Sequence, residues 1–576
     1  MPHHSAPITR FLPFLKWRAT LSEKGIHGDL IAGLSVALVM IPQSLAYAQL
    51  AGFPAHYGLY AAMLPTLLGA LFGSSPYLST GAVALTGMLT AASIAPLATS
   101  GSADHIALGV TLALLAGLIQ LALGILRQGW ALNLLSRPVF AGFINAAALL
   151  ICFSQLPVLL GAQGPRAPDL GGELIRIGHA LSSPDMATLA FGLLAWTGLR
   201  GLQRFAPKWP GVLVVVVLSI GISSTTGYGT SGEVVGSIPS ALPTLSLPQI
   251  PGWDALIGLL PAAFVIALVS FLEAASSAKR LSDRSRHAWN ENQELIGQGL
   301  AKLGAALSGT LPTSASFSRS ALSYRVGANT GLTQVISAIV VIAATLSLAH
   351  WLHDLPKAVL AAIILHAVAN LIDFPGMVQV WRIDRDDALA CWTTFAATLA
   401  FAPQIQNGIL TGLLLSLALV IWQSMKPRVA LLGLHEDDTY RDLERFGLEH
   451  PHPALVILRF DGRLQFVNAA RFSEAMEWAR HIKPGIRCVL LSGAGINAID
   501  TTGLHALTQL AEQMREDGQL LAMCGLKKQV IDVIERDPVW ATLAEHAHYR
   551  HEHAAVEALK PLLEKEKSVD GVRSQL

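Results

Sequence analysis

The sequence predicts an α-helical polytopic membrane protein that ends in a small, water-soluble α/β domain. Of the 576 residues, 52% are hydrophobic and 14% are charged, whereas about 25% are charged in an average soluble protein. The charges are also unevenly placed, because residues 1–425 contain 38 Asp, Glu, Lys and Arg residues and residues 426–576 contain 41. The first part therefore has the composition of a chain dissolved in lipid, and the second that of a domain dissolved in water.

Fourteen stretches are apolar and are about the length of a membrane span. A polar stretch at 224–252, rich in Ser, Gly and Pro, divides them into two groups of seven. They are expected at 29–48, 56–73, 81–97, 105–125, 138–161, 186–203 and 209–223, then at 254–275, 293–311, 315–324, 331–350, 355–374, 387–402 and 405–424. The stretches near 81 and 315 are short and are interrupted by Gly, Pro or Ser.

The expected domain boundaries follow from these spans. Residues 1–28 are a cytoplasmic N-terminal segment, and 29–425 are the transmembrane domain with repeats at about 29–223 and 254–425. A cytoplasmic domain at 437–565 is followed by a tail at 566–576.

The positive charges in the loops predict the orientation of these spans. If the N-terminus is cytoplasmic, the inward loops carry Arg127, Arg137, Arg200, Arg204, Lys208, Lys279, Arg280, Arg284, Arg286, Arg325, Arg382 and Arg385. The outward loops carry only Arg166, Arg176 and Lys357. This bias obeys the positive-inside rule, so both termini are expected in the cytoplasm. The expected location of the protein is the inner membrane of the cell.

Two halves of seven spans are inverted relative to each other, as in many secondary transporters. The third segments of the halves, Ser79–Thr86 and Thr313–Ser320, are both rich in small and hydroxylated residues. If these half-helices begin opposite each other at mid-membrane, their free amides and positive dipole ends form an anion site. The alternative is that the small residues only pack helices, but the matched positions favour a site.

Two charged residues lie deep within the predicted spans. Glu273 is the only acid well inside a long apolar run, and Arg319 lies in the short Ser-rich segment. Charges in hydrocarbon are costly and are functional candidates. Glu273 is expected to carry the coupling proton, and Arg319 to attract the anion or to pair with Glu273 when the site is empty. The alternatives are a structural ion pair for Glu273 and a snorkelling anchor for Arg319. For Lys302, nearer a helix end, snorkelling is the expectation.

The first span adds two polar side chains. Gln43 and Tyr47 follow Pro42 and lie four residues apart, so they share one helix face and can reach a central cavity. A kinked helix with an interfacial tyrosine is the alternative.

Five ordered motifs resemble the SulP family of anion transporters, which includes the bacterial and plant sulfate permeases. The motifs are Asp29–Leu34, Pro42–Ala48, Gly81–Thr86, Asn292–Gly299 and Phe317–Ala321. The resemblance implies fourteen helices in two inverted repeats, divided into a core and a gate that move against each other, and a homodimer. It further implies that the anion lies between the starts of the third and tenth helices. Its ligands would come from Gln43, Tyr47, Ala82, Val83, Ser318 and Arg319, with Glu273 at the proton-coupling position. The Ser-Arg pair is more similar to the sulfate branch than to the bicarbonate or dicarboxylate branches.

The C-terminal part alternates strand-like and helical segments. Residues 454–460 and 464–468 are expected to form a hairpin around Asp461-Gly462. Helices are then expected at 469–479, 504–515 and 527–535, and strands at 487–491 and 520–524.

The loop from Asp500 to Gly503 makes this domain resemble the STAS domain of anion transporters and anti-sigma antagonists. In the signalling relatives the matching hydroxyl, here Thr502, is phosphorylated. Simple helix capping by this Thr is the preferred interpretation.

The expected function is proton-coupled uptake of a small inorganic anion, most simply sulfate, by alternating access. A sodium- or proton-coupled carrier of bicarbonate or a C4-dicarboxylate is the first alternative. The second is a membrane-anchored anion sensor that signals through a regulatory protein at the STAS domain. No catalytic, cofactor or metal motif is present, and the four cysteines lie far apart. A net charge of +1 without a basic stripe excludes nucleic acid as a partner.

Overall fold

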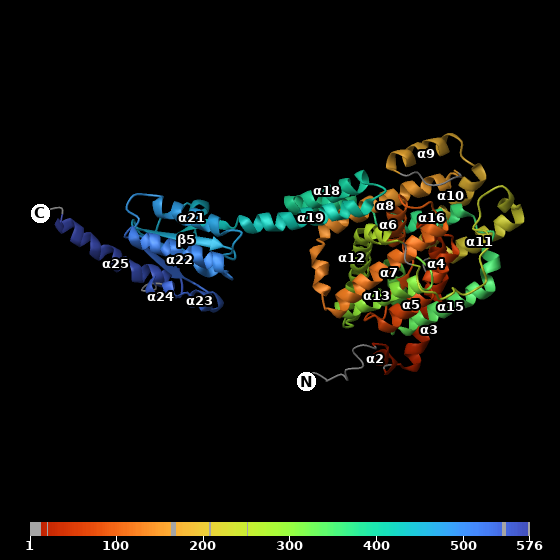
Figure 1. The fold of residues 1–576 in the computed structure, drawn as a ribbon, viewed down its shortest axis with the longest axis horizontal. Helices are drawn as coiled ribbons and strands as arrows, with labels where there is room; N and C mark the ends of the chain where they lie inside the picture. The colour runs from red at the N-terminus through yellow and green to blue at the C-terminus, as the bar shows by residue number, and fades with distance from the viewer. Residues whose placement is uncertain are drawn as a thin grey trace. The chain divides into compact units, whose positions relative to one another are not determined.

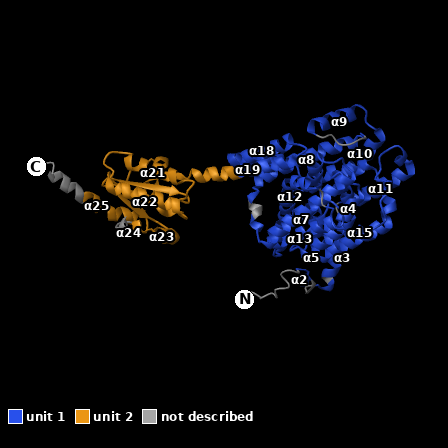
Figure 2. Ribbon diagram, in the orientation of Figure 1, with its two compact units in different colours: residues 1–416 blue, residues 417–576 orange. Residues whose placement is uncertain are grey.

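The computed structural model describes residues 13–19, 21–162, 169–206, 209–249, 252–543 and 549–573. Arg166 and Lys208, which contribute to the predicted orientation, lie outside these residues. The chain divides into two compact units, Met1–Ser416 and Leu417–Leu576 (Figure 2).

The first unit is almost entirely helical (Figure 1). Before the polar stretch it contains α2 (Phe14–Ala19), α3 (Glu23–Leu50), α4 (His56–Ala61), α5 (Leu64–Phe72), α6 (Ala84–Ile94), α7 (Ala103–Ile125), α8 (Arg137–Leu159), α9 (Leu170–Ser182), α10 (Met186–Phe205) and α11 (Gly211–Thr226). After it come α12 (Trp253–Ser285), α13 (Glu291–Leu307), α14 (Phe317–Val326), α15 (Leu332–Leu348), α16 (Lys357–Ala369), α17 (Phe374–Ile383), α18 (Arg385–Ala400) and the first part of α19 (Ile405–Met425), which crosses the boundary between the units.

Each predicted span contains a helix, but three details differ. The span at 56–73 is broken between α4 and α5, where Pro65 starts the second helix. The amphipathic helix α9 was not predicted, because its buried Glu173 and its Arg176 make it too polar to count as a span. Helix α17 likewise lies in a predicted loop. In the described part of the chain, seven helices are long and apolar enough to cross a membrane, so the total of fourteen crossings stays a prediction.

Small residues let the central helices approach closely. Helix α13 packs along α7 and α5. A Cβ atom added to Gly299 would lie 2.7 Å from the backbone nitrogen of Leu121, and one added to Gly117 would lie 3.0 Å from the Gly299 carbonyl oxygen. Only glycine permits this contact between α7 and α13.

A buried carboxylate joins α3 to the start of α15. Asp29 is fully buried and accepts hydrogen bonds from the backbone nitrogens of Asn329 and Thr330 at 2.6 and 3.0 Å. It also accepts from the hydroxyls of Thr330 and Thr333 at 2.6 and 2.8 Å. This side chain therefore satisfies two buried backbone amides in the loop before α15 and ties that loop to α3.

Replacing Asp29 by Ala should destabilise the membrane unit strongly. Four donors would lose their acceptor inside the protein, at a cost of about 3 kcal/mol or more. Thermal unfolding of the purified chain should shift down by several degrees. Asp29→Asn keeps one acceptor oxygen, so its unfolding temperature should lie between those of the wild type and Asp29→Ala. Glu23→Gln, in the exposed first turn of the same helix, is the control, and equal unfolding temperatures for the Asp29→Ala and Glu23→Gln variants would contradict the assignment.

The second unit is a five-stranded sheet with helices on both faces. The strand order is β4 (Tyr440–Asp442), β3 (Arg428–Leu434), β5 (Leu455–Asp461), β6 (Cys488–Ser492) and β7 (Leu520–Cys524). Strands β5, β6 and β7 are parallel, whereas β3 is antiparallel to β4 and β5. One apolar face packs on α21 (Ala469–His481), α22 (Thr501–Glu516) and α23 (Lys528–Ile534), and the other packs on α25 (Glu552–Arg573). Short helices α20 (Leu443–Phe446) and α24 (Pro538–Leu543) complete the unit.

Two sequence predictions for this domain were wrong. Residues 464–468 form no second hairpin strand. Leu464 makes only an isolated bridge with Ile499, and β5 pairs instead with β3 and β6. The sheet also begins at Arg428, before the expected boundary at 437. Both errors have one cause, because the partner of β5 lies in the segment that was interpreted as a linker.

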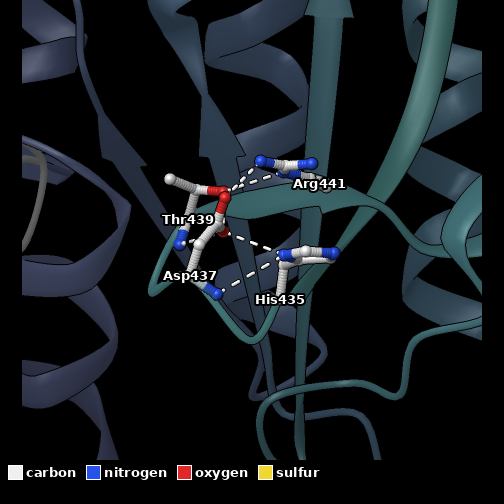
Figure 3. A network of polar contacts seen from close by, with 4 residues as sticks. All are labelled: His435, Asp437, Thr439 and Arg441. Carbon is white, nitrogen blue, oxygen red and sulfur yellow. Dashed lines mark hydrogen bonds and ion pairs between the residues drawn. The ribbon is translucent and has the colours of Figure 1, made fainter.

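The turn between β3 and β4 is held by a polar network (Figure 3). Asp437 Oδ1 accepts from the Thr439 hydroxyl at 2.5 Å and lies 2.9 Å from His435 Nδ1. The Arg441 guanidinium binds the other oxygen and also donates to the Thr439 hydroxyl at 3.0 Å. The hydrogen bond from the Thr439 side chain, followed by His435 and the charge of Arg441, lowers the pKa of Asp437 to about 2.

Replacing Asp437 by Asn should loosen this turn. Because the pKa of the folded state lies below the ordinary 3.8, the carboxylate stabilises the turn above about pH 3.8 and loses this effect as the pH falls toward about 2. At pH 7 the Thr439 amide, which donates to Asp437, should exchange its hydrogen faster in the variant, and the difference should narrow below pH 4. Asp438→Asn is the control, since Asn tolerates its φ of 60°. An unchanged exchange rate at pH 7 would contradict the prediction.

Candidate anion site

The two Ser-rich segments meet in a short ribbon inside the membrane unit. Strands β1 (Ser79–Gly81) and β2 (Ser314–Ser316) pair antiparallel, with Ser79 opposite Ser316 and Gly81 opposite Ser314. All six residues are buried. Helix α6 starts three residues after β1, and α14 starts directly after β2. Because antiparallel strands lead away in opposite directions, both helices begin at this ribbon and run apart.

The start of α6 has backbone donors that no side chain caps. Its N-cap residue, Val83, is 3% exposed and makes no capping hydrogen bond through its side chain. The start of α14 is capped by the Ser316 hydroxyl, 3.5 Å from the Arg319 nitrogen. A buried helix beginning with free N–H groups and a positive dipole end favours an anion.

Arg319 places a positive charge at this point. The residue is fully buried, and its Nη2 donates to the carbonyl oxygen of Ala82 at 3.1 Å, directly before α6. Its Nε and Nη1 donate at 3.3 Å to the Ser79 hydroxyl and to Gln43 Oε1. A Cβ added to Gly81 would lie 3.3 Å from Nη2, which explains a glycine there. Arg319 is therefore held beside the ribbon and does not snorkel to an interface.

Gln43 and Tyr47 bring α3 to the same place. Both are buried, at 5% and 4% exposure. Gln43 orients the arginine, and Tyr47 lies within electrostatic range of both Arg319 and Glu273. A Cβ on Gly87 of α6 would lie 3.0 Å from the Tyr47 carbonyl oxygen, so α3 and α6 are in close contact. Tyr47 therefore lies in the interior.

The other predicted contact residues surround the two helix beginnings. Ala82 and Val83 are buried directly before α6. Ser318 lies in the first turn of α14 and is exposed, with its hydroxyl 3.3 Å from the Ser316 hydroxyl. The structure thus brings all six predicted binding residues, from α3, the segment before α6 and the first turn of α14, to the ends of one ribbon.

Glu273 lies in the middle of α12, next to this ribbon. Its Oε2 accepts from the Ser314 hydroxyl at 3.4 Å, and Ser314 also donates to the Ser270 carbonyl oxygen at 2.9 Å. The expected direct ion pair with Arg319 is absent between these two described residues, because the arginine is occupied by Gln43, Ser79 and Ala82. The two charges still interact electrostatically.

Sequence reasoning missed Lys302 and its surroundings. Lys302 was expected to snorkel, but it is fully buried and donates to Gln120 Oε1 of α7 at 2.9 Å. The sequence signal that could have indicated this contact is the presence of two long polar side chains, Gln120 and Lys302, within otherwise apolar stretches.

Thr502 lies in the cytoplasmic domain and is exposed in the first turn of α22. The cap of this helix is Asp500, which accepts from the Gly503 nitrogen at 2.8 Å and from the Phe466 nitrogen at 2.9 Å. The expected capping role of Thr502 was therefore wrong, because the aspartate occupies that position. Among the described residues, no group of three His, Cys, Asp or Glu side chains could hold a metal ion.

This fold and this site define a class, the polytopic helical membrane proteins that transport anions. Comparison with known proteins makes the class specific. Residues 26–394 match the Sulfate permease family and residues 448–538 match the STAS domain. The chain belongs to the sulfate permease family and carries a STAS domain.

Relatives cover nearly the whole chain. Sulfate transporter 4.1, chloroplastic, from Arabidopsis thaliana is 32% identical, over 96% of this chain and 82% of its own. A probable sulfate transporter of Mycobacterium tuberculosis is 31% identical, over 90% of this chain and 94% of its own.

Solved structures give the same result for the fold. Murine solute carrier 26 family member A9, an anion transporter in the inward-facing state, shares the fold at a TM-score of 0.89 with 22% identity, over 97% of this chain and 96% of its own. The transmembrane domain of the cyanobacterial bicarbonate transporter BicA matches 69% of this chain and 98% of its own, at a TM-score of 0.59 and 26% identity.

Proposed function

We propose that this protein takes up sulfate together with protons by alternating access. The observation that carries the proposal is the fully buried Arg319, held against the uncapped beginning of α6. A tetrahedral oxyanion offers acceptors to both the guanidinium and the free helix amides. The relatives that are named sulfate transporters support sulfate as the substrate.

Glu273 is the proposed proton carrier. It is partly buried beside Ser314, within electrostatic range of Arg319. A carboxyl group can exchange its charge for a proton within the membrane, whereas Arg319 remains cationic. Protonation of Glu273 would remove a negative charge near the arriving anion, so proton and anion would bind together.

Gln43, Tyr47, Ala82, Val83, Ser318 and Arg319 are the proposed anion-binding residues. The protein would span the inner membrane fourteen times as a homodimer, with residues 1–28, the C-terminal domain whose sheet begins at Arg428, and both termini in the cytoplasm. The STAS domain would serve assembly or regulation.

Bicarbonate is the second candidate substrate, since the matching BicA structure is of a bicarbonate transporter. A C4-dicarboxylate is the third. A sensing function would use the exposed Thr502 as a phosphorylation site, which mass spectrometry of the protein purified from its host would detect.

Reconstituted vesicles test the substrate and the coupling ion together. Labelled sulfate, bicarbonate and succinate would be offered separately under an imposed proton gradient, a sodium gradient or no gradient. Concentrative sulfate uptake only with the proton gradient supports the proposal. Sulfate entry that is indifferent to the proton gradient, or faster bicarbonate or succinate uptake, contradicts it.

A further inference from the structure

Lys302 is a second buried cation close to the anion site. It is completely buried, with 0% of its surface accessible. No acidic side chain in the described residues lies within ion-pair distance of it. Within the described part of the chain its hydrogen-bond partner is the neutral Gln120 of α7, 2.9 Å away. A buried lysine that only a neutral amide contacts needs a further source of negative charge to stay protonated, because burial by itself favours the neutral amine.

The hydrogen bonds around Lys302 lead toward the ribbon. Gln120 Nε2 donates to the Ala267 carbonyl oxygen at 2.7 Å and to the Ser270 hydroxyl at 3.0 Å. These two residues lie one to two turns before Glu273 on α12. The Ser270 carbonyl oxygen in turn accepts from Ser314 of β2, which also contacts Glu273. Lys302 is thereby fixed on the side of α12 that adjoins the site.

The side chain of Lys302 packs against α7. A Cβ on Gly117 of α7 would lie 3.0 Å from the Lys302 Cβ, so the lysine stem passes directly against the α7 backbone. Of the acidic groups nearby, Glu294 on the same helix is already occupied by Ser74, Ser75 and Gln298. Glu273 remains, and it interacts electrostatically with Lys302.

The charges around the ribbon can then be summed. Arg319 and a protonated Lys302 contribute two positive charges, and an ionised Glu273 contributes one negative charge, which leaves +1 in the empty site. If Glu273 takes up a proton, the two cations equal the charge of a divalent anion. In this protonated state a monovalent anion would leave one positive charge uncompensated in a low-dielectric interior, whereas with Glu273 ionised it would balance the site without a proton.

We infer that Lys302 is a specificity-determining residue, whose buried charge makes the transport site select a divalent anion once Glu273 has taken up its proton. It acts through the electrostatic field and does not touch the anion. This inference rests on the proposed function, because it assumes that the anion binds at the Arg319 ribbon.

The test compares two neutral substitutions in the full chain. Lys302→Gln keeps a hydrogen-bond donor for Gln120 but removes the charge, and Lys302→Met removes both. Lys279→Gln, an exposed lysine on α12, is the control. Binding of labelled sulfate is measured in the purified protein, and nitrate, a monovalent probe, is measured by competition at constant ionic strength.

Because a Coulomb interaction scales with the charge of the ligand, the effect on sulfate should be about the square of that on nitrate. We expect sulfate to bind about tenfold more weakly and nitrate about threefold more weakly in both variants. If Lys302→Gln binds sulfate as tightly as the wild type does, the role of the lysine is only its structural hydrogen bond. Equal losses for the two anions would indicate distortion. Either outcome overturns the inference.

Gln120→Glu provides a second route if the lysine variants do not fold. It places a carboxylate against Lys302 and neutralises the charge without removing it. The same square relation between the losses for sulfate and nitrate is expected, and an unchanged sulfate affinity overturns the inference. The wild-type protein separates the two proposals, because a wild type that binds no sulfate at all contradicts the proposed function itself.

Discussion

Replacing Arg319 by Gln should weaken sulfate binding by at least about 100-fold. Hydrogen bonds to charged groups are worth about 1.5–3 kcal/mol each, and two of them account for a loss of this size. The substitution also removes the one charge that lies directly at the beginning of α6. Isothermal titration of the purified protein with sulfate measures the effect.

The variant series for Arg319 separates charge from geometry. Arg319→Lys keeps the charge but loses the planar fork that reaches Ser79, Gln43 and Ala82 together, so an intermediate affinity is expected. Arg325→Gln removes an exposed charge from the last turn of the same helix and should leave sulfate binding within about twofold. Thermal unfolding verifies that each variant is folded. A folded Arg319→Gln protein that binds sulfate as the wild type does would refute the assignment.

Replacing Glu273 by Gln should abolish proton-driven accumulation while sulfate exchange continues. Each pH unit corresponds to about 1.4 kcal/mol, which is about a tenfold concentration ratio per coupled proton. Vesicles with the membrane potential clamped at zero should therefore accumulate sulfate about tenfold per pH unit with the wild type. With Gln, which cannot bind or release the proton, internal sulfate should only equal the external concentration.

Exchange of labelled for unlabelled sulfate needs no net proton movement, so it indicates whether the variant still binds and moves the anion. Asp283→Asn, exposed on the same helix, serves as the matched control and should accumulate sulfate normally. Concentrative uptake by Glu273→Gln would eliminate this residue as the proton carrier. Loss of exchange as well as accumulation would give Glu273 a structural role.

The fold class and the family could be predicted from the sequence because they depend on features that persist along the chain. Long apolar runs and the change in charge density near residue 425 indicate two environments, and both the helical membrane unit and the STAS domain are confirmed. The matched Ser-rich segments indicated the place of Arg319, and the helix face after Pro42, the deep acid of α12 and the family resemblance indicated that Gln43 and Glu273 lie near it. Their roles in binding and coupling stay predictions.

The missed features depend on partners that are distant in the sequence. Strand β3 was not recognised, although its residues Arg428–Leu434 are mostly apolar, because it directly follows the apolar helix α19 and its partner β5 begins only at Leu455. The burial of Lys302 depends on α7, about 180 positions earlier in the chain. Likewise, Asp500 and Thr502 are both residue types that cap helices. Asp500 is the cap because its backbone is extended and α22 begins at the next residue, Thr501.

The pairing of β1 with β2 restricts how such a protein can work. The hydrogen bonds of this ribbon are buried, so separating its strands would leave donors and acceptors without water. The ribbon and the two helix beginnings should therefore move as one rigid body. The anion would gain access from either side of the membrane when this whole body is displaced relative to the remaining helices. A disulfide engineered across the ribbon would consequently leave transport intact. A disulfide that linked this rigid body to one of the remaining helices would stop transport.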